Sequence, residues 1–294
     1  MSISKWLKKN AASLKNKTVA ISGATGGIGT RLCEHIASLG ADIVLLDRSY
    51  ERSHALGVSL SERFPGISVS YITMDLEDMA SVRLAAQRLA KMEIDALVLN
   101  AGAYHIPRKK CDTGLDNVFQ INFAAPYYLA RELKDGLVER GGRIVAVGSI
   151  AHNYSHIDER DVDFSTYTKS SKVYGNAKRH LMFALQGLYE GSDALAVTHP
   201  GITFTNITAH YPKLIFAIIK HPMKVIFMKP AKASLSILKG LFESTGKNEW
   251  IGPRFFNVWG MPNKKVLRTC SPEEARVICQ RAEAIYEKLK QAEK

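Results

Sequence analysis

The stretch that decides the fold is Ser22-Gly23-Ala24-Thr25-Gly26-Gly27-Ile28-Gly29. It follows a short apolar run at residues 18–22, and apolar side chains then recur at helical spacing from Ile28 to Leu39. Glycines let a backbone turn tightly and approach a phosphate closely, and a helix N-terminus offers unpaired N–H groups and a positive dipole end. A strand, a glycine-rich turn and a helix in this order therefore predict a phosphate-binding turn.

An acidic residue follows this turn at the spacing that is typical of a nucleotide-binding fold. Gly40 predicts the end of the helix, and residues 42–47 have the pattern of a second buried strand that ends in Asp47. Asp47 comes 18 residues after Gly29, about where a dinucleotide-binding fold places the carboxylate that holds a ribose 2′-hydroxyl. The alternative is a glycine-rich loop in an unrelated α/β protein, and the position of Asp47 favours the nucleotide site.

Composition bounds the class of protein. The chain has 294 residues, of which 46% are hydrophobic and 23% charged, as in ordinary globular proteins. Its net charge of +12 favours acidic partners: a dinucleotide, an anionic membrane surface or a nucleic acid. We find no nucleic-acid-binding motif and expect no nucleic-acid partner.

Several features predict a cytoplasmic protein with reduced thiols. The four cysteines form no CxxC pair and no metal-ligand spacing. The first twenty residues are too polar for a secretory signal, and no run reaches the ~18 apolar residues of a spanning helix. We expect no metal site, and interpret the one cluster of histidines and carboxylates as a solvated loop; its members are His152, His156, Asp158, Glu159, Asp161 and Asp163.

Strand-like and helix-like patterns alternate through the first 200 residues. This alternation, with strands that look buried on both faces, predicts an α/β fold with a doubly wound parallel sheet. There is no repeat or linker, so we expect one domain over residues 1–294. Residues 115–138 are predicted to form one long helix. Residues 250–253 are predicted to form a last edge strand, and Ser271-Pro272 to start the final helix.

The region after Pro200 is predicted to shape a substrate pocket. We assign that role to residues 202–245. Within it, residues 211–228 are rich in large apolar side chains but are interrupted by lysines, so they predict a helical lid rather than a spanning helix. The lid is also predicted to touch a membrane surface, assisted by Trp6 and the N-terminal lysines; simple packing in the core is the alternative.

Tyr174 and Lys178 form the second chemical signal. Four residues apart on a helix, a phenol and an ammonium group lie on one face. A nearby cation favours the phenolate, so we expect a lowered Tyr174 pKa and an acid/base role. Alone, this spacing is weak.

Together with the other motifs it makes the chain similar to the short-chain dehydrogenase/reductase family over almost its whole length. Gly23, Gly27 and Gly29 match the family's TGxxxGxG turn, with Ser22 in place of threonine. The matches that follow in order are Asp75-Leu76, Asn100-Ala101-Gly102, Asn122, Ser149, Tyr174 with Lys178, and Pro200-Gly201 with Thr205.

The resemblance implies a Rossmann-type fold and an oxidoreductase that interconverts alcohols and carbonyls with NAD or NADP. It implies catalytic roles for Asn122, which positions a water, Ser149, which orients the substrate oxygen, Tyr174, which exchanges a proton, and Lys178, which holds the nicotinamide ribose. The cofactor contacts it implies are Gly23, Thr25, Gly27, Ile28, Gly29, Asp47, Arg48, Asp75, Leu76, Asn100, Ala101, Gly102, Tyr174, Lys178, Pro200, Gly201 and Thr205.

Finer features bear on the branch and the rival functions. The 25-residue gap from Ser149 to Tyr174 and the Ser149-Ile-Ala-His152 motif are similar to the retinol-dehydrogenase-like branch, which implies a hydrophobic, lipid-like substrate. Gly23, Gly26 and Gly29 also fit the GxxGxxG turn of the related sugar-nucleotide epimerases, but the chain length and the other motifs favour a reductase. A non-catalytic dinucleotide sensor is the other rival; such proteins usually lack one catalytic residue, and here all four are present.

The sequence gives opposing signals on the cofactor. Asp47 would accept both ribose hydroxyls of NAD and repel the 2′-phosphate of NADP, whereas Arg48 would attract that phosphate. A residue fixed at a strand end should outweigh a flexible arginine, so we expect NAD, with NADP as the alternative. The oligomeric state is left open, with a homodimer as one option.

Overall fold

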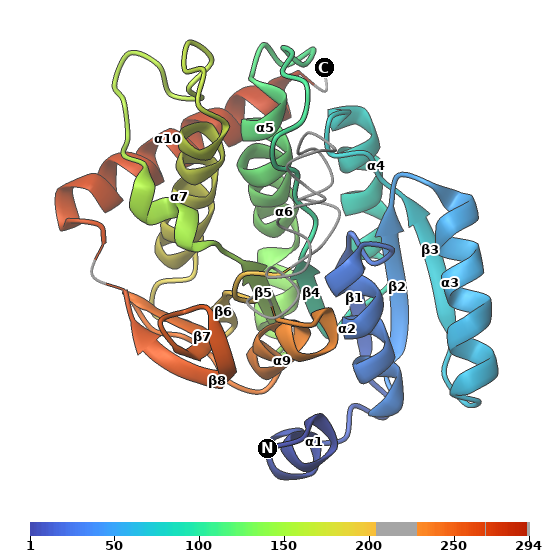
Figure 1. The fold of residues 1–294 in the computed structure, drawn as a ribbon. Helices are drawn as coiled ribbons and strands as arrows, with labels where there is room; N and C mark the ends of the chain where they lie inside the picture. Colours follow the sequence, from blue (N-terminus) through green and yellow to red (C-terminus); the bar gives the residue numbers. More distant parts are fainter. Residues whose placement is uncertain (204–227, 268, 293–294) are drawn as a thin grey trace, which may run out of the picture.

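The computed structural model describes residues 1–203, 228–267 and 269–292, which form a layered α/β structure (Figure 1). Its eight strands make one sheet in the order β3-β2-β1-β4-β5-β6-β7-β8. Every neighbouring pair is parallel except β7 and β8, which form an antiparallel hairpin. The strands are β1 (Thr18–Ser22), β2 (Asp42–Asp47), β3 (Val69–Thr73), β4 (Ala96–Leu99), β5 (Arg143–Val147), β6 (Leu195–Thr198), β7 (Glu249–Phe255) and β8 (Trp259–Val266).

Helices cover both faces of this sheet, as expected for a doubly wound fold (Figure 1). The α-helices are α1 (Ile3–Asn10), α2 (Gly27–Ser38), α3 (Tyr50–Arg63), α4 (Met79–Ala90), α5 (Asn117–Phe119), α6 (Ala125–Glu139), α7 (Ser170–Leu188), α9 (Pro230–Gly240) and α10 (Pro272–Gln291). Two short helices of other types are the π-helix η1 (Gln120–Ala124) and the 3-10 helix η2 (Ile150–Tyr154).

Each central strand supplies side chains to two separate cores. In β1, Val19 and Ile21 pack toward α2 and α9, while Ala20 packs toward α4, α6 and α7. This strict alternation explains why the strands read as continuous apolar runs, because a parallel strand covered on both sides has no solvent face. The predicted Rossmann-type sheet is confirmed.

Three local expectations are corrected. Residues 250–253 do not form the edge of the sheet, since β8 pairs with β7 beyond them. The sequence pattern does not predict β8, because its glycine, proline, asparagine and lysines are unusual in a strand. The helix expected over residues 115–138 is divided by the π-helix η1. Trp6, expected to assist membrane contact, is buried in α1 at 2% exposure and packs into the core.

Two predictions concern segments that bear on membranes and the pocket. The expected lid at residues 211–228 and most of the pocket region that precedes α9 lie outside the described residues. Within the residues that are described, no helix is both long enough and apolar enough to cross a membrane.

The topology places the site. β1 and β4 are neighbours, although the chain continues from β1 outward through β2 and β3 before it returns. The connections after β1 and β4 therefore diverge and leave a crevice at the carboxyl ends of the strands. The predicted glycine turn and Asn100 follow β1 and β4, so both border this crevice.

Candidate active site

The glycine turn after β1 is packed too closely for side chains. Gly23 has a φ of +64°, and a Cβ on it would lie 2.8 Å from the Cα of Ala101. A Cβ on Gly29 would lie 2.2 Å from the carbonyl oxygen of Gly23. Helix α2 starts directly after Gly26. The first N–H groups of a helix have no partner within it, and Gly26 provides no side chain to cap them. The turn and the helix end together fit an anionic group such as a pyrophosphate.

Ser22 and Asn100 hold the turn in place. The Ser22 hydroxyl accepts hydrogen bonds from the backbone N–H groups of Asn100 and Ala101, both at 3.1 Å. The Asn100 side-chain amide donates to the carbonyl oxygens of Ser22 and Gly23, both at 3.0 Å. A hydroxyl is what this position requires, which explains why serine serves where the family has threonine.

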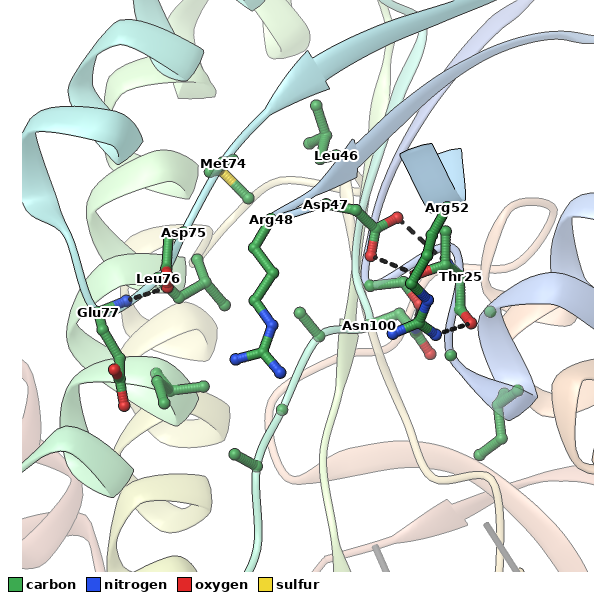
Figure 2. Close-up of a pocket in the computed structure, with 18 of the residues that line it drawn as sticks. Thr25, Leu46, Asp47, Arg48, Arg52, Met74, Asp75, Leu76, Glu77 and Asn100 are labelled. Atoms are coloured by element: carbon green, nitrogen blue, oxygen red, sulfur yellow. Dashed lines mark hydrogen bonds between the residues drawn. The ribbon is translucent and has the colours of Figure 1, made fainter. Parts of the chain in front are cut away.

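A cleft of about 350 Å³ opens beside this turn (Figure 2). The predicted cofactor contacts that line it are Gly23, Thr25, Gly27, Ile28, Gly29, Asp47, Arg48, Asp75, Leu76, Asn100, Ala101 and Gly102. Further lining residues that sequence reasoning missed are Gly26, Leu46, Arg52, Met74, Glu77, Ala103, Ile106 and Ile121. Most of them neighbour a predicted contact, so only chain proximity could have signalled them.

The end of the cleft formed by Asp47, Arg48 and Arg52 is here called the Asp47 end. The Asp47 carboxylate accepts hydrogen bonds from the backbone N–H and the hydroxyl of Thr25, each at 3.1 Å (Figure 2). Burial raises the pKa of Asp47, and these bonds and the charge of Arg52 oppose the rise. Arg52 donates to the Thr25 carbonyl oxygen at 2.9 Å, while the Arg48 side chain extends across the cavity. Two exposed cations thus stand near one half-buried carboxylate.

Ser149, Tyr174 and Lys178 are not among the residues that line this cleft. They form a group beside it, near Gly102, and this group is here called the Tyr174 end. The side chains of Tyr174 and Ser149 share a hydrogen bond, and the ring of Tyr104 packs edge-on against Tyr174 with centroids 5.2 Å apart. The Lys178 Nζ donates to the carbonyl oxygen of Val147 at 2.9 Å and lies 5.8 Å from the centroid of the Tyr174 ring. Tyr104 was not foreseen, because nothing in its sequence neighbourhood marks it.

Burial controls the ionisation of this pair. It raises the pKa of Tyr174 to about 12, although the hydrogen bond from Ser149 acts in the opposite direction. It also lowers the pKa of Lys178 to about 8. The sequence predicts that Lys178 lowers the Tyr174 pKa. In this structure the Tyr174 pKa is raised instead, because desolvation is the largest cause and Lys178 is not among the groups that shift it.

Asn122 links the Tyr174 end to the cleft. Its side-chain amide donates to the carbonyl oxygens of Ala103 and Val118, both at 2.8 Å, and its Oδ1 accepts from the Ala103 N–H at 3.2 Å. A Cβ on Gly102 would lie 2.8 Å from that oxygen and 3.5 Å from the Lys178 Nζ. Gly102 lines the cleft, so the catalytic candidates adjoin it. Asn122 lies in the π-helix η1, a type of distortion that is frequent at functional sites.

The remaining predicted contacts follow β6. Pro200 and Gly201 are buried, and Gly201 has a φ of +85°. A Cβ on Gly201 would lie 2.8 Å from the carbonyl oxygen of Val258 in the β7–β8 hairpin. This segment is thus packed against the hairpin and does not line the cleft described above. Thr205 lies outside the described residues.

The cluster interpreted as a solvated loop is only partly so. His152 is fully buried; its ring nitrogens lie 2.5 Å from the Ser149 carbonyl oxygen and 3.0 Å from the Thr269 hydroxyl. Burial lowers its pKa to about 4, so it is neutral. Among the described residues, no group of three or more His, Cys, Asp or Glu side chains is arranged to hold a metal ion.

Comparison with known proteins agrees with this geometry. The family model for short chain dehydrogenase matches residues 17–175. The chain is similar to human polyprenol dehydrogenase, at 26% identity over 66% of this chain and 63% of that protein. It is also similar to human retinol dehydrogenase 13, at 28% identity over 68% of this chain and 62% of that protein. The alignments thus span less than two thirds of either relative.

A solved structure adds a cofactor-bound relative. The short-chain dehydrogenase from Sphingobium yanoikuyae in complex with NADPH is 26% identical, with a TM-score of 0.50 over 66% of this chain and 74% of that one. The glycine turn, the cleft and the matched family model support one conclusion. The chain belongs to the short-chain dehydrogenase/reductase family and resembles its retinol-dehydrogenase-like members.

Proposed function

We propose that this protein is an NAD(P)-dependent oxidoreductase that interconverts a hydrophobic alcohol and its carbonyl. The observation that carries the proposal is the hydrogen-bonded Ser149 and Tyr174 pair, which stands with buried Lys178 beside the glycine-lined cleft. A hydroxyl pair of this kind can hold and protonate one oxygen of a substrate.

The cleft fits a nicotinamide dinucleotide. The backbone approach at Gly23 and Gly29 and the uncapped start of α2 suit a pyrophosphate. Asp47 lines the same cleft, and we assign it the role of accepting ribose hydroxyls. Asp75, whose Oδ1 accepts the Glu77 N–H at 2.9 Å, and Leu76 border the region that an adenine would fill. When bound, this group donates or accepts a hydride. Tyr174, Lys178, Pro200, Gly201 and Thr205 remain proposed contacts of its nicotinamide half.

The chain's own residues divide the remaining work. Ser149 orients the substrate oxygen by a hydrogen bond. With its raised pKa, Tyr174 is protonated at neutral pH and gives its proton to a carbonyl oxygen in reduction. In oxidation, Tyr174 must first lose its proton, and the resulting phenolate then accepts the proton of the alcohol. Lys178 holds ribose hydroxyls, and Asn122 fixes the Ala103 backbone beside it and, by family resemblance, positions a water.

The proposed substrate class is hydrophobic, resembling a retinoid, a steroid or another lipid. The names of human polyprenol dehydrogenase and retinol dehydrogenase 13 support it. The test gives pure protein a panel of retinoids, steroids, long-chain alcohols and small alcohols with NAD⁺ or NADP⁺. Reduction of a dinucleotide by the apolar alcohols is expected. No turnover with any alcohol or carbonyl would instead favour the rival reading, a non-catalytic dinucleotide-binding sensor or scaffold.

We also propose that NAD is the preferred dinucleotide. Two hydrogen bonds from Thr25 fix the position of the Asp47 carboxylate at the end of β2, whereas Arg48 is an exposed side chain. Arg52 is a second cation at this end, but its hydrogen bond to the Thr25 carbonyl oxygen restrains its side chain from moving toward a 2′-phosphate. The 2′-phosphate of NADP would therefore meet a fixed carboxylate.

A reducing compartment, the cytoplasm, is the proposed location. Cys33, Cys111, Cys270 and Cys279 are all free thiols, as this location requires. Contact with a membrane surface would bring the protein to an apolar substrate. We further propose one domain over residues 1–294, with residues 202–245 as the substrate-pocket segment.

A further inference from the structure

The hairpin of β7 and β8 ends in an exposed aromatic tip. This tip, residues 255–259, carries Phe255 at 55% exposure, Phe256 at 84% and Trp259 at 41%. Large apolar side chains scattered singly over a surface are ordinary, but three within five residues form a patch. Such a patch on a hairpin marks a contact with something apolar.

The backbone presents this patch at a conformational cost. Phe256 has a φ of +52° and Asn257 a φ of +58°, in the left-handed region that bulky residues seldom adopt. The Phe256 ring, at 84% exposure, gains little in exchange from burial against the part of the chain that the structure describes. Lys265 braces the loop from behind, because its Nζ donates to the Pro253 carbonyl oxygen at 2.6 Å and to the Asn257 side chain at 2.9 Å. The tip is thus a fixed projection, and strain of this kind clusters at functional sites.

The charged residues within the hairpin segment 250–267 are all basic. Residues 250–267 include Arg254, Lys264 and Lys265 and no acidic residue. Lys264 lies near Glu243 and Glu249, and Lys265 braces the loop, so Arg254 is the exposed cation at the tip. Its guanidinium carbon lies 5.6 Å from the centroid of the Phe255 ring. The chain as a whole carries a charge of +12.

The tip also borders the predicted nicotinamide segment. Gly201 approaches the Val258 carbonyl oxygen, and the His199 ring lies 3.1 Å from the Asn257 carbonyl oxygen. The hairpin forms the edge of the sheet beyond β6, where it can reach a surface that the core cannot (Figure 1). A partner held at the tip would therefore sit close to this predicted nicotinamide segment.

We propose that the hairpin tip docks on the surface of an anionic lipid bilayer, with Phe255, Phe256 and Trp259 in the interfacial region and Arg254 at the head groups. Aromatic side chains favour the membrane interface, and cations are drawn to anionic lipid. Charge complementarity selects this occupant over a second copy of the chain, which is equally basic. The choice of a lipid surface as useful to the enzyme rests on the proposed apolar substrate, but the binding itself does not.

Vesicle co-sedimentation without substrate or cofactor tests the docking. Full-length protein is mixed with vesicles of phosphatidylcholine alone, or of phosphatidylcholine and phosphatidylglycerol in equal parts, at low and high salt. We expect binding to the anionic vesicles, with loss of most of it at high salt. Phe256→Asn, which suits a positive φ and so keeps the fold, should lower the partition coefficient by about tenfold.

A matched variant controls for loss of an exposed apolar side chain elsewhere. Leu84 is 48% exposed on α4, and Leu84→Gln should bind vesicles as the unmodified protein does. The proposal is overturned if the unmodified protein ignores anionic vesicles or if Phe256→Asn binds them equally well. It is also overturned if Phe256→Asn only converts a dimer into a monomer in sedimentation velocity, since the tip would then join two copies.

Tryptophan fluorescence locates the contact. Of the three tryptophans, Trp6 and Trp250 are each 2% exposed, so Trp259 is the one that lipid can reach. Brominated phosphatidylcholine in the anionic vesicles should quench the emission, and Trp259→Phe should remove the quenched part while vesicle binding persists. Quenching that survives Trp259→Phe would contradict the proposal. A protein that binds vesicles yet turns over no alcohol and no carbonyl compound would refute the proposed function and leave the docking intact.

Discussion

At the Tyr174 end the cation Lys178 is buried, whereas at the Asp47 end the cations reach solvent. Lys178 is 2% exposed and has one described hydrogen-bond acceptor, the Val147 carbonyl oxygen. Arg48 and Arg52 are exposed, and Asp47 is only half-buried. Desolvation therefore decides protonation at the Tyr174 end. At the Asp47 end, competition between neighbouring charges decides which ligand fits.

The comparison teaches where sequence motifs stop being sufficient. The YxxxK spacing brings the phenol and the ammonium onto one helix face, but the pKa values depend on residues that bury them. Conversely, Asp47 and Arg48 are adjacent in sequence, yet the balance of charge at their end of the cleft also includes Arg52, from the first turn of α3. Variants at the two ends should thus differ in what they change.

The largest effect is expected at Tyr174. Tyr174→Phe removes the proton donor and should lower kcat by about 10²–10⁴-fold while the dinucleotide dissociation constant changes little. Tyr167→Phe is the matched control, because the Tyr167 hydroxyl donates a hydrogen bond to Asp158 rather than contacting Ser149. This variant should keep normal turnover. Steady-state kinetics and cofactor titration measure both. Near-normal turnover by Tyr174→Phe would remove it from the mechanism.

Next in size is the glycine turn between the two ends. Gly29→Ala places a Cβ 2.2 Å from the Gly23 carbonyl oxygen, so the turn must shift. Misplacement on this scale should weaken dinucleotide binding about 10²-fold. Gly246→Ala is the control, because a Cβ there meets only the flexible Glu249 side chain, at 3.3 Å. Equal affinities for the two variants, by calorimetry, would argue against a cradle at this turn.

At the Asp47 end, substitutions are expected to change the preference for NAD over NADP. Asp47→Ala should narrow or reverse the gap between NAD and NADP affinity by about tenfold, because loss of a charge-assisted hydrogen bond costs about 1.5–3 kcal/mol and like-charge repulsion disappears. Arg48→Ala should widen the gap in favour of NAD. Both cofactors are titrated into all three proteins. Tighter NADP binding by the unmodified protein would show that Arg48 and Arg52 prevail over Asp47.

The smallest effect is a pH dependence of stability at the Tyr174 end. Lys178 has a pKa of about 8 when folded and an ordinary value of 10.5 when unfolded, so above pH 8 the unfolded chain binds more protons. Stability from this group therefore rises with pH. Relative to Lys178→Met, the unmodified protein should gain about 1 kcal/mol in unfolding free energy over the first pH unit above 8.

Denaturant titrations of both proteins at the two pH values measure that gain. The buried thiols of Cys33 and Cys270 have raised pKa values, so their contribution to the unfolding free energy falls as pH rises. Taking the difference between the two proteins removes that contribution. Parallel pH dependences would mean that Lys178 is not desolvated. Lys178→Met should also weaken both cofactor binding and turnover, since Lys178 is proposed to serve both.

Much of the fold and of the cleft could be predicted from the sequence. The glycine turn, Asp47, Asp75 and Asn100 each lie at or just beyond the carboxyl end of a strand, and the carboxyl ends of parallel strands meet at one edge. Local spacing was therefore enough to bring these residues to one cleft. The same logic found Tyr174 and Lys178, because a four-residue step on a helix is a local property.

Only the tertiary structure decided the rest. It paired β8 with β7, turned residues 255–259 outward, brought Arg52 to Thr25 and packed Gly201 against Val258. It also raised the Tyr174 pKa where the local Tyr–Lys pattern predicted a lowered one. The physical reason is common to all of these. Burial, close approach and hairpin pairing depend on atoms distant in the chain, whereas turns, helix faces and strand ends follow from neighbours in sequence.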